Sequence, residues 1–174
     1  MRFLVASDSH GRVSALLDMV AKGNTHRFPA DGIIFLGDGI GDLCYLEDSG
    51  LPIFPVAGNC DMLSFGAPKE EILSFDGYRI LITHGDRYGV KGGESALVSH
   101  AAAMNADVVL YGHTHLPSER YYSVGTEIAG TELQKPITVM NPGSIRECGG
   151  GFPPGYGVLE LTSAGVLWSR VALI

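Results

Sequence analysis

Cysteines, charged residues and long apolar runs are all scarce in this 174-residue chain. The three cysteines, Cys44, Cys60 and Cys148, are widely spaced and form no CxxC pair, which argues against a disulfide framework and against a cysteine zinc site. No apolar run approaches the roughly 18 residues that a membrane helix needs, and the apolar stretch before Ser7 is too short for a signal peptide. We therefore expect a cytoplasmic protein in a reducing compartment, with no membrane partner.

Positive charge is the scarcer of the two signs. Lys plus Arg number 12 against 19 Asp plus Glu, a formal net charge of -7, so we expect no broad basic face and no duplex nucleic acid as a partner. Hydrophobic residues make up 45%, which excludes intrinsic disorder, and the length predicts a single domain over residues 1–174. Glycine is abundant, with 24 residues, about twice ordinary usage. Many backbone positions are therefore expected to need positive φ or close approach to a ligand.

Apolar runs bounded by polar turns predict a mixed α/β (α+β) architecture. Helical spacing of apolar residues predicts helices over about 13–20 and 94–104. The last third of the chain contains strand-like segments without an obvious helix. The expected strands are 3–6, 32–36, 53–56, 78–83, 107–111, 120–124, 137–140, 156–161 and 166–172.

Potential metal ligands follow five of these expected strands, where open α/β sheets bind their ligands. They are Asp8, His10, Asp38, Asn59, His84, His113 and His115. Imidazole, carboxylate and amide groups together suit Mn, Fe, Zn or Ni. Seven ligands exceed the needs of one ion, which predicts two ions that share a carboxylate. Extended backbone would send both members of the pairs Asp8/His10 and His113/His115 to the same side.

The order of these motifs resembles the calcineurin-like metallophosphoesterase family: DxH, GD, GN, an isolated His and GHxH. The segment Asn141-Pro142-Gly143-Ser144 is similar to a turn of its small YfcE-type phosphodiesterase branch. The resemblance implies a four-layer αββα sandwich of two mixed β-sheets flanked by helices. It also implies a two-metal phosphodiesterase that hydrolyses a small phosphate ester by attack of a metal-bridging hydroxide.

The resemblance further implies how the ligands divide between two divalent ions, with manganese expected and nickel, iron or zinc as alternatives. One ion would be held by Asp8, His10, Asp38 and His115, and the other by Asp38, Asn59, His84 and His113. Asp38 would thus bridge the two ions.

One position departs from the family pattern. Cys60 follows Asn59 where the family has a histidine that helps the leaving group, and a thiol with a pKa of ~8.5 is a poor general acid. We keep Asn59 and Cys60 as candidate catalytic residues. Arg12 and Arg146 are candidates for binding the substrate phosphate through their guanidinium groups.

Other interpretations remain open at this point. The seven residues could cap turns, and the chain could be a non-catalytic scaffold of the kind formed by the retromer subunit of the vacuolar sorting machinery, which resembles this fold. It could also be a phosphomonoesterase, and the sequence leaves room for a homo-oligomer.

His26 and His100 lack any motif and are expected outside the site. Specificity is expected to depend on the loops 61–69, 87–93 and 149–155.

Overall fold

The computed structural model describes residues 1–173 and contains two mixed five-stranded sheets. The first sheet has the order β12-β11-β1-β2-β3 and consists of β1 (Arg2–Ala6), β2 (Gly32–Phe35), β3 (Ile53–Pro55), β11 (Gly155–Thr162) and β12 (Gly165–Ala172). The second has the order β4-β5-β6-β10-β7 and consists of β4 (Glu70–Phe75), β5 (Tyr78–Thr83), β6 (Val108–Tyr111), β7 (Pro117–Tyr122) and β10 (Ile137–Pro142). The strands β1, β2 and β3 of the first sheet run parallel, and so do β5, β6 and β10 of the second.

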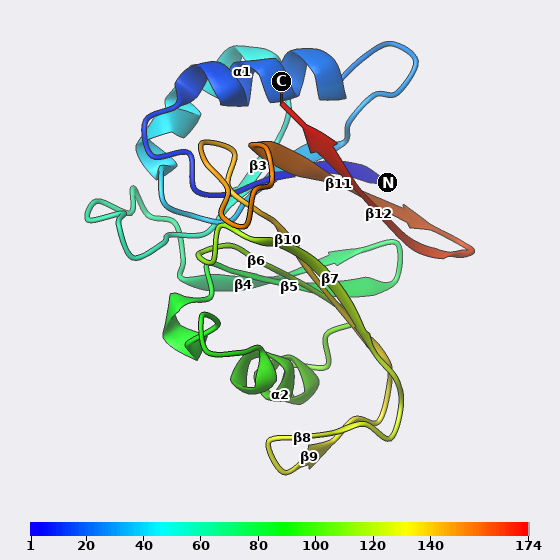
Figure 1. Cartoon of the computed structure of the whole chain (residues 1–174). Helices are drawn as coiled ribbons and strands as arrows, with labels where there is room; N and C mark the ends of the chain where they lie inside the picture. The colour runs from blue at the N-terminus through cyan, green and yellow to red at the C-terminus, as the bar shows by residue number, and fades with distance from the viewer. Residues whose placement is uncertain (174) are drawn as a thin grey trace.

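Helices cover the outer faces of both sheets (Figure 1). The helix α1 (Val13–Gly23) and the 3-10 segment η1 (Ile40–Ser49) lie over the first sheet, and α2 (Ser95–Ala103) lies over the second. A short 3-10 turn, η2 (Asp86–Tyr88), and a small hairpin of β8 (Glu127–Ile128) and β9 (Thr131–Glu132) complete the elements. The expected four-layer αββα arrangement is confirmed.

The alternation of side chains along each strand builds the core in layers. In β1, Leu4 packs toward α1, whereas Phe3 and Val5 point into the core between the two sheets, and all three are fully buried. Burial on both faces explains why the parallel strands are continuous apolar runs rather than alternating ones. A third core lies between the second sheet and α2.

The expected helices and strands are present, most with shifted ends, and five elements were missed: β4, η1, η2, β8 and β9. The strand β4 is an edge strand that is buried mainly at Leu73, so its outward charged residues weakened the apolar pattern. The segment η1 and the β8–β9 hairpin were also missed. The strand expected at 120–124 instead spans Pro117–Tyr122, at the sheet edge where proline is tolerated. Within the described residues the last third contains no helix, as expected.

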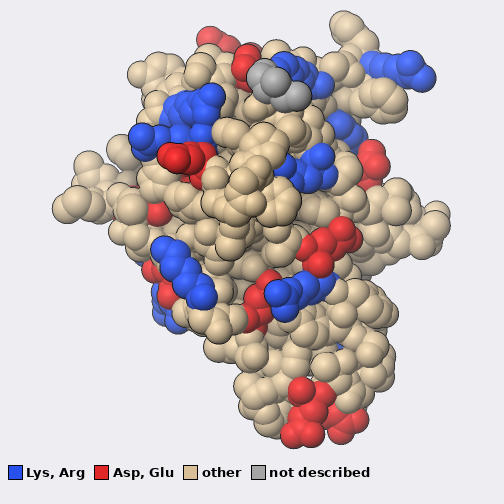
Figure 2. Space-filling view, in the orientation of Figure 1, with Lys and Arg blue, Asp and Glu red and all other residues tan. Residues whose placement is uncertain are grey.

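Charges of both signs are mixed on the surface. Figure 2 shows Lys and Arg interspersed with Asp and Glu on this face, with no broad basic patch, and acidic side chains at the tip formed by β8 and β9. Glu127 and Glu132 pair across that hairpin and are exposed. Of the helices in residues 1–173, none combines the length and the apolar character that crossing a membrane requires.

Candidate metal centre

The carboxylate of Asp8 lies at the bottom of the site and is fully buried. Its Oδ2 accepts hydrogen bonds from the Ser7 hydroxyl at 2.5 Å and from the backbone N–H of His113 at 3.2 Å. Its Oδ1 has no aligned hydrogen-bond donor in the described part of the chain. A buried carboxylate oxygen without a donor is costly unless a cation neutralises it.

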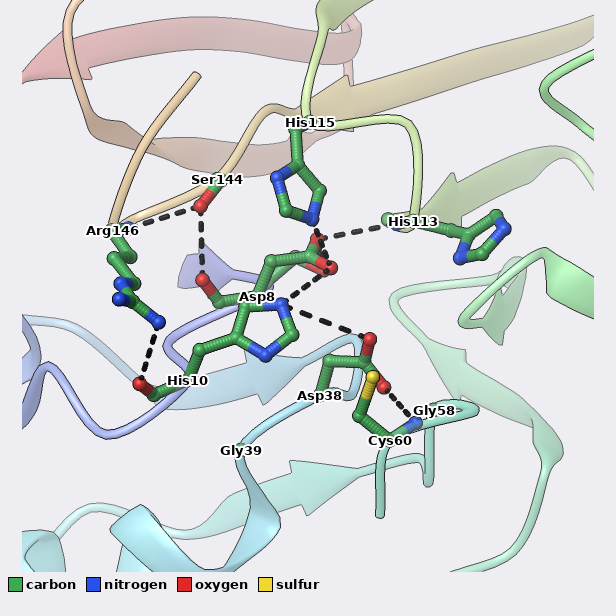
Figure 3. Close-up of polar contacts among 12 residues, drawn as sticks. Asp8, His10, Asp38, Gly39, Gly58, Cys60, His113, His115, Ser144 and Arg146 are labelled. Carbon is green, nitrogen blue, oxygen red and sulfur yellow. Dashed lines mark hydrogen bonds and ion pairs between the residues drawn. The ribbon is translucent and has the colours of Figure 1, made fainter. Parts of the chain in front are cut away.

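Two histidines surround that oxygen. The Nε2 atom of His115 lies 3.1 Å from Asp8 Oδ1, and the Nε2 atom of His10 lies 3.9 Å from it. Figure 3 shows both rings directed at Asp8 from opposite sides. Asp8, His10 and His115 therefore form a first cluster of potential ligand atoms, all within 4.8 Å of one another. The carboxylate of Asp8 raises the pKa of His115, against the effect of burial.

A second cluster contains Asp38, His84 and His113. The ring of His84 is buried, and its Nδ1 is 2.7 Å from the carbonyl oxygen of Leu36, which requires a proton on Nδ1. That proton leaves Nε2 as the ring atom that can bind a cation in the cluster. The Nε2 atom lies 3.1 Å from His113 Nδ1 and 3.2 Å from the Oδ1 atom of Asn59. The structure thus brings Asn59 to the second cluster.

Asp38 lies between the two clusters. Its Oδ2 atom is 3.4 Å from His84 Nε2 and 3.8 Å from His10 Nε2, and its Oδ1 accepts the backbone N–H of Cys60 at 2.7 Å. Burial alone would raise the pKa of Asp38, but the hydrogen bonds from His84 and Cys60 outweigh it and hold that pKa well below its ordinary value. Asp38 is therefore a carboxylate at neutral pH, facing both clusters.

The backbone conformation expected at the two pairs of candidate ligands was wrong. Asp8, His10, His113 and His115 do not lie on extended backbone but have φ angles of 57°, 42°, 65° and 57°. Left-handed backbone is costly for residues other than glycine, of order 1–3 kcal/mol each, and is concentrated at functional sites. The turn also separates the HxH pair, since His113 faces His84 whereas His115 faces Asp8.

Each cluster takes side chains from both sheets. Asp8 and His10 follow β1 and Asp38 follows β2, all in the first sheet. His84 follows β5, and the loop with His113 and His115 follows β6, in the second sheet. The carboxyl ends of these strands meet at one edge of the sandwich, which is why residues far apart in sequence converge.

The thiol of Cys60 faces His10 and Asp38, and these three residues form a further group within 4.8 Å. Its hydrogen bond with the Asp38 carboxylate raises the pKa of the Cys60 thiol, and burial adds to this effect. Cys60 is exposed, and Asn59 donates from Nδ2 to its Sγ at 3.3 Å. Its location suits contact with a substrate, but a raised pKa makes it a still weaker acid.

The two arginines lie beside the first cluster and are tied to backbone carbonyls. Arg12 donates from Nη1 to the carbonyl oxygen of Arg146 at 2.6 Å, and Arg146 donates from Nη1 to that of His10 at 3.2 Å. Both residues are exposed, so further donor groups face solvent.

His100 lies away from the site, with its Nε2 3.2 Å from Glu70 Oε1. His26 is exposed and belongs to neither cluster.

Asp61 is a positioning residue that the sequence analysis missed. Its carboxylate accepts four backbone N–H groups, at distances of 2.8 to 3.0 Å, from Asp38, Gly39, Ile40 and Gly58. It therefore joins the loop after β2 to the loop after β3. The available signal was an acidic residue three positions after Gly58, a spacing typical of side chains that accept turn N–H groups.

A second support comes from the turn after β10. The Ser144 hydroxyl donates to the Asp8 carbonyl oxygen at 2.9 Å, and Asn141 donates from Nδ2 to the Gly112 carbonyl oxygen at 2.9 Å. Both side chains are fully buried. They connect the Asn-Pro-Gly-Ser turn to the loops that carry Asp8 and His113.

Two glycines allow the close approach of these loops. A Cβ atom on Gly58 would lie 2.1 Å from Asp38 Oδ1, and one on Gly112 would lie 1.9 Å from the Ser7 hydroxyl oxygen. Neither space can accommodate a side chain. The high glycine content thus has a role at this edge of the sandwich.

The donor set fits divalent cations. Two ligand atoms bound to one ion at ~2.1 Å lie on the order of 3 Å apart, which matches the spacing of the facing ring nitrogens of His84 and His113. The unpaired buried oxygen of Asp8 needs positive charge. Mixed imidazole and carboxylate ligands favour transition metals over magnesium or calcium.

Comparison with known families identifies the chain. The model for the calcineurin-like phosphoesterase superfamily domain matches residues 1–164. The chain belongs to this superfamily. The resemblance drawn from the motifs is thereby confirmed, together with the expectation of a metal-dependent phosphoesterase.

Relatives of this calcineurin-like phosphoesterase include named bacterial proteins. It is 35% identical to the probable metallophosphoesterase YsnB of Bacillus subtilis, covering 84% of this chain and 76% of YsnB. It is 29% identical to the phosphodiesterase YfcE of Escherichia coli, covering 92% of this chain and 88% of YfcE. Vps29 of Entamoeba histolytica, solved in complex with zinc, shares the fold with a TM-score of 0.68 at 20% identity, covering 98% of each chain.

Proposed function

We propose that this phosphoesterase is a two-metal-dependent phosphodiesterase that hydrolyses a small phosphate ester with water activated by the metal ions. The observation that carries the proposal is the position of Asp38. Its Oδ2 atom lies between His10 of the first cluster and His84 of the second, at 3.8 and 3.4 Å. A carboxylate shared by two adjacent ligand sets is the arrangement that a pair of cations requires.

The proposed ligands divide as the two clusters do. Asp8, His10, Asp38 and His115 would hold one ion, and Asp38, Asn59, His84 and His113 would hold the other, with manganese proposed and nickel, iron or zinc as alternatives. Divalent ions at such a site lower the pKa of water and neutralise charge on phosphoryl oxygens.

The chain itself supplies orientation rather than a nucleophile. The Leu36 carbonyl fixes the tautomer of His84, so that Nε2 faces the cluster. Burial, followed by the neighbouring His84 and Lys91, lowers the pKa of His113, which favours the neutral ring that binds a cation. In the same proposal, the Cys60 thiol contacts the leaving group without protonating it efficiently. Asn59 orients that thiol. Arg12 and Arg146 bind outer phosphate oxygens.

The surroundings of the clusters favour a small substrate. A cavity of about 330 Å³ is lined by His113, His115 and Lys91, which is near the lower limit for small-molecule sites. The chain carries an acidic net charge of -7, so attraction of phosphate depends on bound cations and on local basic side chains.

The decisive experiment measures metal content and hydrolysis on the same samples. Protein is freed of metal with EDTA, reloaded with manganese or nickel, and assayed by elemental analysis. Bis(4-nitrophenyl) phosphate and 4-nitrophenyl phosphate then report diester and monoester cleavage. We expect about two ions per chain and faster cleavage of the diester. Preferential cleavage of the monoester would establish the phosphomonoesterase alternative instead.

The scaffold alternative follows from the shared fold with Vps29. A solved Vps29 structure contains zinc, so metal binding alone cannot distinguish the scaffold from the phosphodiesterase proposal. Hydrolysis is the discriminating measurement. Metal-loaded protein that cleaves neither ester would refute the phosphodiesterase proposal.

We also propose a cytoplasmic location, because the three cysteines are free and two of them, Cys44 and Cys60, are exposed. Fractionation of cells that produce the protein tests this location. The homo-oligomer that the sequence left open is tested by light scattering of the purified protein.

A further inference from the structure

A second cavity adjoins the one beside the metal centre. The first, of about 330 Å³, is lined by His113 and His115, and the second has a volume of about 560 Å³. The two cavities share Lys91 and Thr114 in their walls. A molecule that places a phosphate beside the histidines therefore has direct access to the second cavity, which we call the arm pocket.

The arm pocket has an apolar wall that includes an exposed aromatic ring. Phe152 is 49% exposed and Leu116 is 44% exposed, and both line the pocket together with Val90 and Pro117. Phe152 belongs to the glycine-rich segment 149–155, and Val90 to the segment 87–93. Two of the three loops expected to set specificity thus form this pocket.

Part of the pocket wall belongs to a hydrogen-bonded network around Glu94. This buried carboxylate accepts the hydroxyl groups of Tyr111 at 2.6 Å and Tyr122 at 3.0 Å. The Nε atom of Arg120 lies 3.7 Å from the same carboxylate. The network satisfies both oxygens of Glu94, so the pocket presents a preformed surface rather than an unpaired buried charge.

Basic side chains lie at the pocket, although the whole chain is acidic. Lys91 is exposed at the junction with the first cavity, next to His113 and His115. An ammonium group there is placed to contact a phosphate oxygen that points away from the metal centre. The apolar wall begins immediately beyond it, at Val90. From the first cavity to the arm pocket, the groups are therefore the candidate metal ligands, then the Lys91 ammonium, then the apolar wall with its aromatic ring.

We propose that the arm pocket binds an aromatic organic arm of the phosphate ester, with its ring against Phe152 and its phosphate beside Lys91. This inference rests on the proposed phosphoesterase function and adds the substrate class: esters with a flat, aromatic group rather than a short alkyl group. A pocket of this volume accommodates a small organic molecule, and it offers an apolar wall beside polar and charged groups that can orient a ligand.

The test uses binding rather than turnover. Phenylphosphonate and methylphosphonate, whose C–P bonds resist hydrolysis, are titrated into manganese-loaded protein in a calorimeter. The variants are Phe152→Ala and Lys91→Gln. The control is Phe65→Ala, because Phe65 is a still more exposed aromatic residue (74%) that lines a different, apolar groove of about 610 Å³.

The wild-type protein is expected to prefer phenylphosphonate. Phe152→Ala should reduce that preference roughly 3- to 10-fold, the range for a lost aromatic pair. Lys91→Gln should weaken both phosphonates by a similar factor of about five, because it removes a phosphate contact at an exposed position. Phe65→Ala should leave both affinities unchanged.

Several results would overturn the arm pocket: equal wild-type affinities for the two phosphonates, a preference unaffected by Phe152→Ala, or a preference lost in Phe65→Ala. Failure to bind either phosphonate would also overturn the arm pocket, whereas the proposed function is decided by ester hydrolysis. Protein that keeps the phenyl preference but hydrolyses no ester would refute the proposed function alone. Hydrolysis without a phenyl preference would refute the arm pocket alone.

Discussion

The hydroxyl group of Ser144 donates a hydrogen bond to the backbone carbonyl oxygen of Asp8, 2.9 Å away and 136 residues earlier in the chain. The same oxygen of Ser144 accepts the backbone N–H groups of Arg146 and Glu147. One buried hydroxyl therefore connects the loop after β10 to the loop that carries the first ligand cluster (Figure 3).

Replacing this hydroxyl should destabilise the fold and loosen the first cluster. Ser144→Ala leaves the buried carbonyl of Asp8 and two N–H groups without their partner, so the free energy of unfolding should fall by about 1–3 kcal/mol. Urea denaturation of metal-free protein measures this loss, with Ser163→Ala at an exposed turn position as the control. Equal losses in the two variants would contradict the role of Ser144.

Asp38→Asn should weaken both proposed metal sites together. The substitution keeps the shape of the side chain but removes the negative charge that faces His10 and His84. Elemental analysis after loading with manganese should show the loss of both ions. The control is Asp18→Asn on the exposed face of α1, which should retain them. Loss of a single ion in Asp38→Asn would contradict a shared ligand.

Cys60→His should raise turnover on esters with poor leaving groups. The thiol faces Asp38 and His10, but the hydrogen bond with Asp38 raises its pKa and weakens it as an acid. An imidazole titrates near neutral pH and can protonate a leaving oxygen. The measurement compares kcat for phenyl and 4-nitrophenyl diesters at equal metal content. Equal or lower turnover on the phenyl ester would count against this role for position 60.

Stability should decline at alkaline pH partly through Tyr88. Burial raises the pKa of Tyr88, and its hydrogen bond to Glu70 raises it further. The folded state therefore favours the protonated phenol, a contribution that is complete below the ordinary tyrosine pKa of ~10 and is lost as pH rises above it.

Urea denaturation of metal-free protein between pH 8 and 11 tests this prediction. Tyr88→Phe should show a shallower decline above pH ~10 than the wild type. Tyr121→Phe removes an exposed phenol and serves as the control. Parallel declines in wild type and Tyr88→Phe would show that another group is responsible.

The layered fold was predictable because its central strands are continuous apolar runs, such as Phe3 to Ala6, each followed by a polar turn. The missed elements have weak patterns. The strand β4 lies at a sheet edge, and the 3-10 segment η1 has no regular apolar spacing that distinguishes it from a loop. An apolar pattern in the sequence reveals an element that buries a whole face. The missed elements bury only part of a face, so their apolar patterns are weak.

The candidate ligands were predictable from residue type and order, whereas their support was not. Asp61, Ser144 and Asn141 act through backbone groups that become neighbours only when the two sheets pack. The backbone conformation also eluded prediction. The pairs Asp8/His10 and His113/His115 were expected on extended backbone, but all four residues have left-handed φ angles.

The origin of the ligands in two sheets has a consequence for the whole molecule. Any cation held by Asp8 and His115, or by Asp38 and His84, cross-links the two halves of the sandwich at one edge. A ligand that binds only the folded state stabilises it by about 2.7 kcal/mol when present at 100 times its Kd. In the proposed two-metal enzyme, the cation supply would therefore set how firmly the halves are held together. Metal-free protein should open first along this edge.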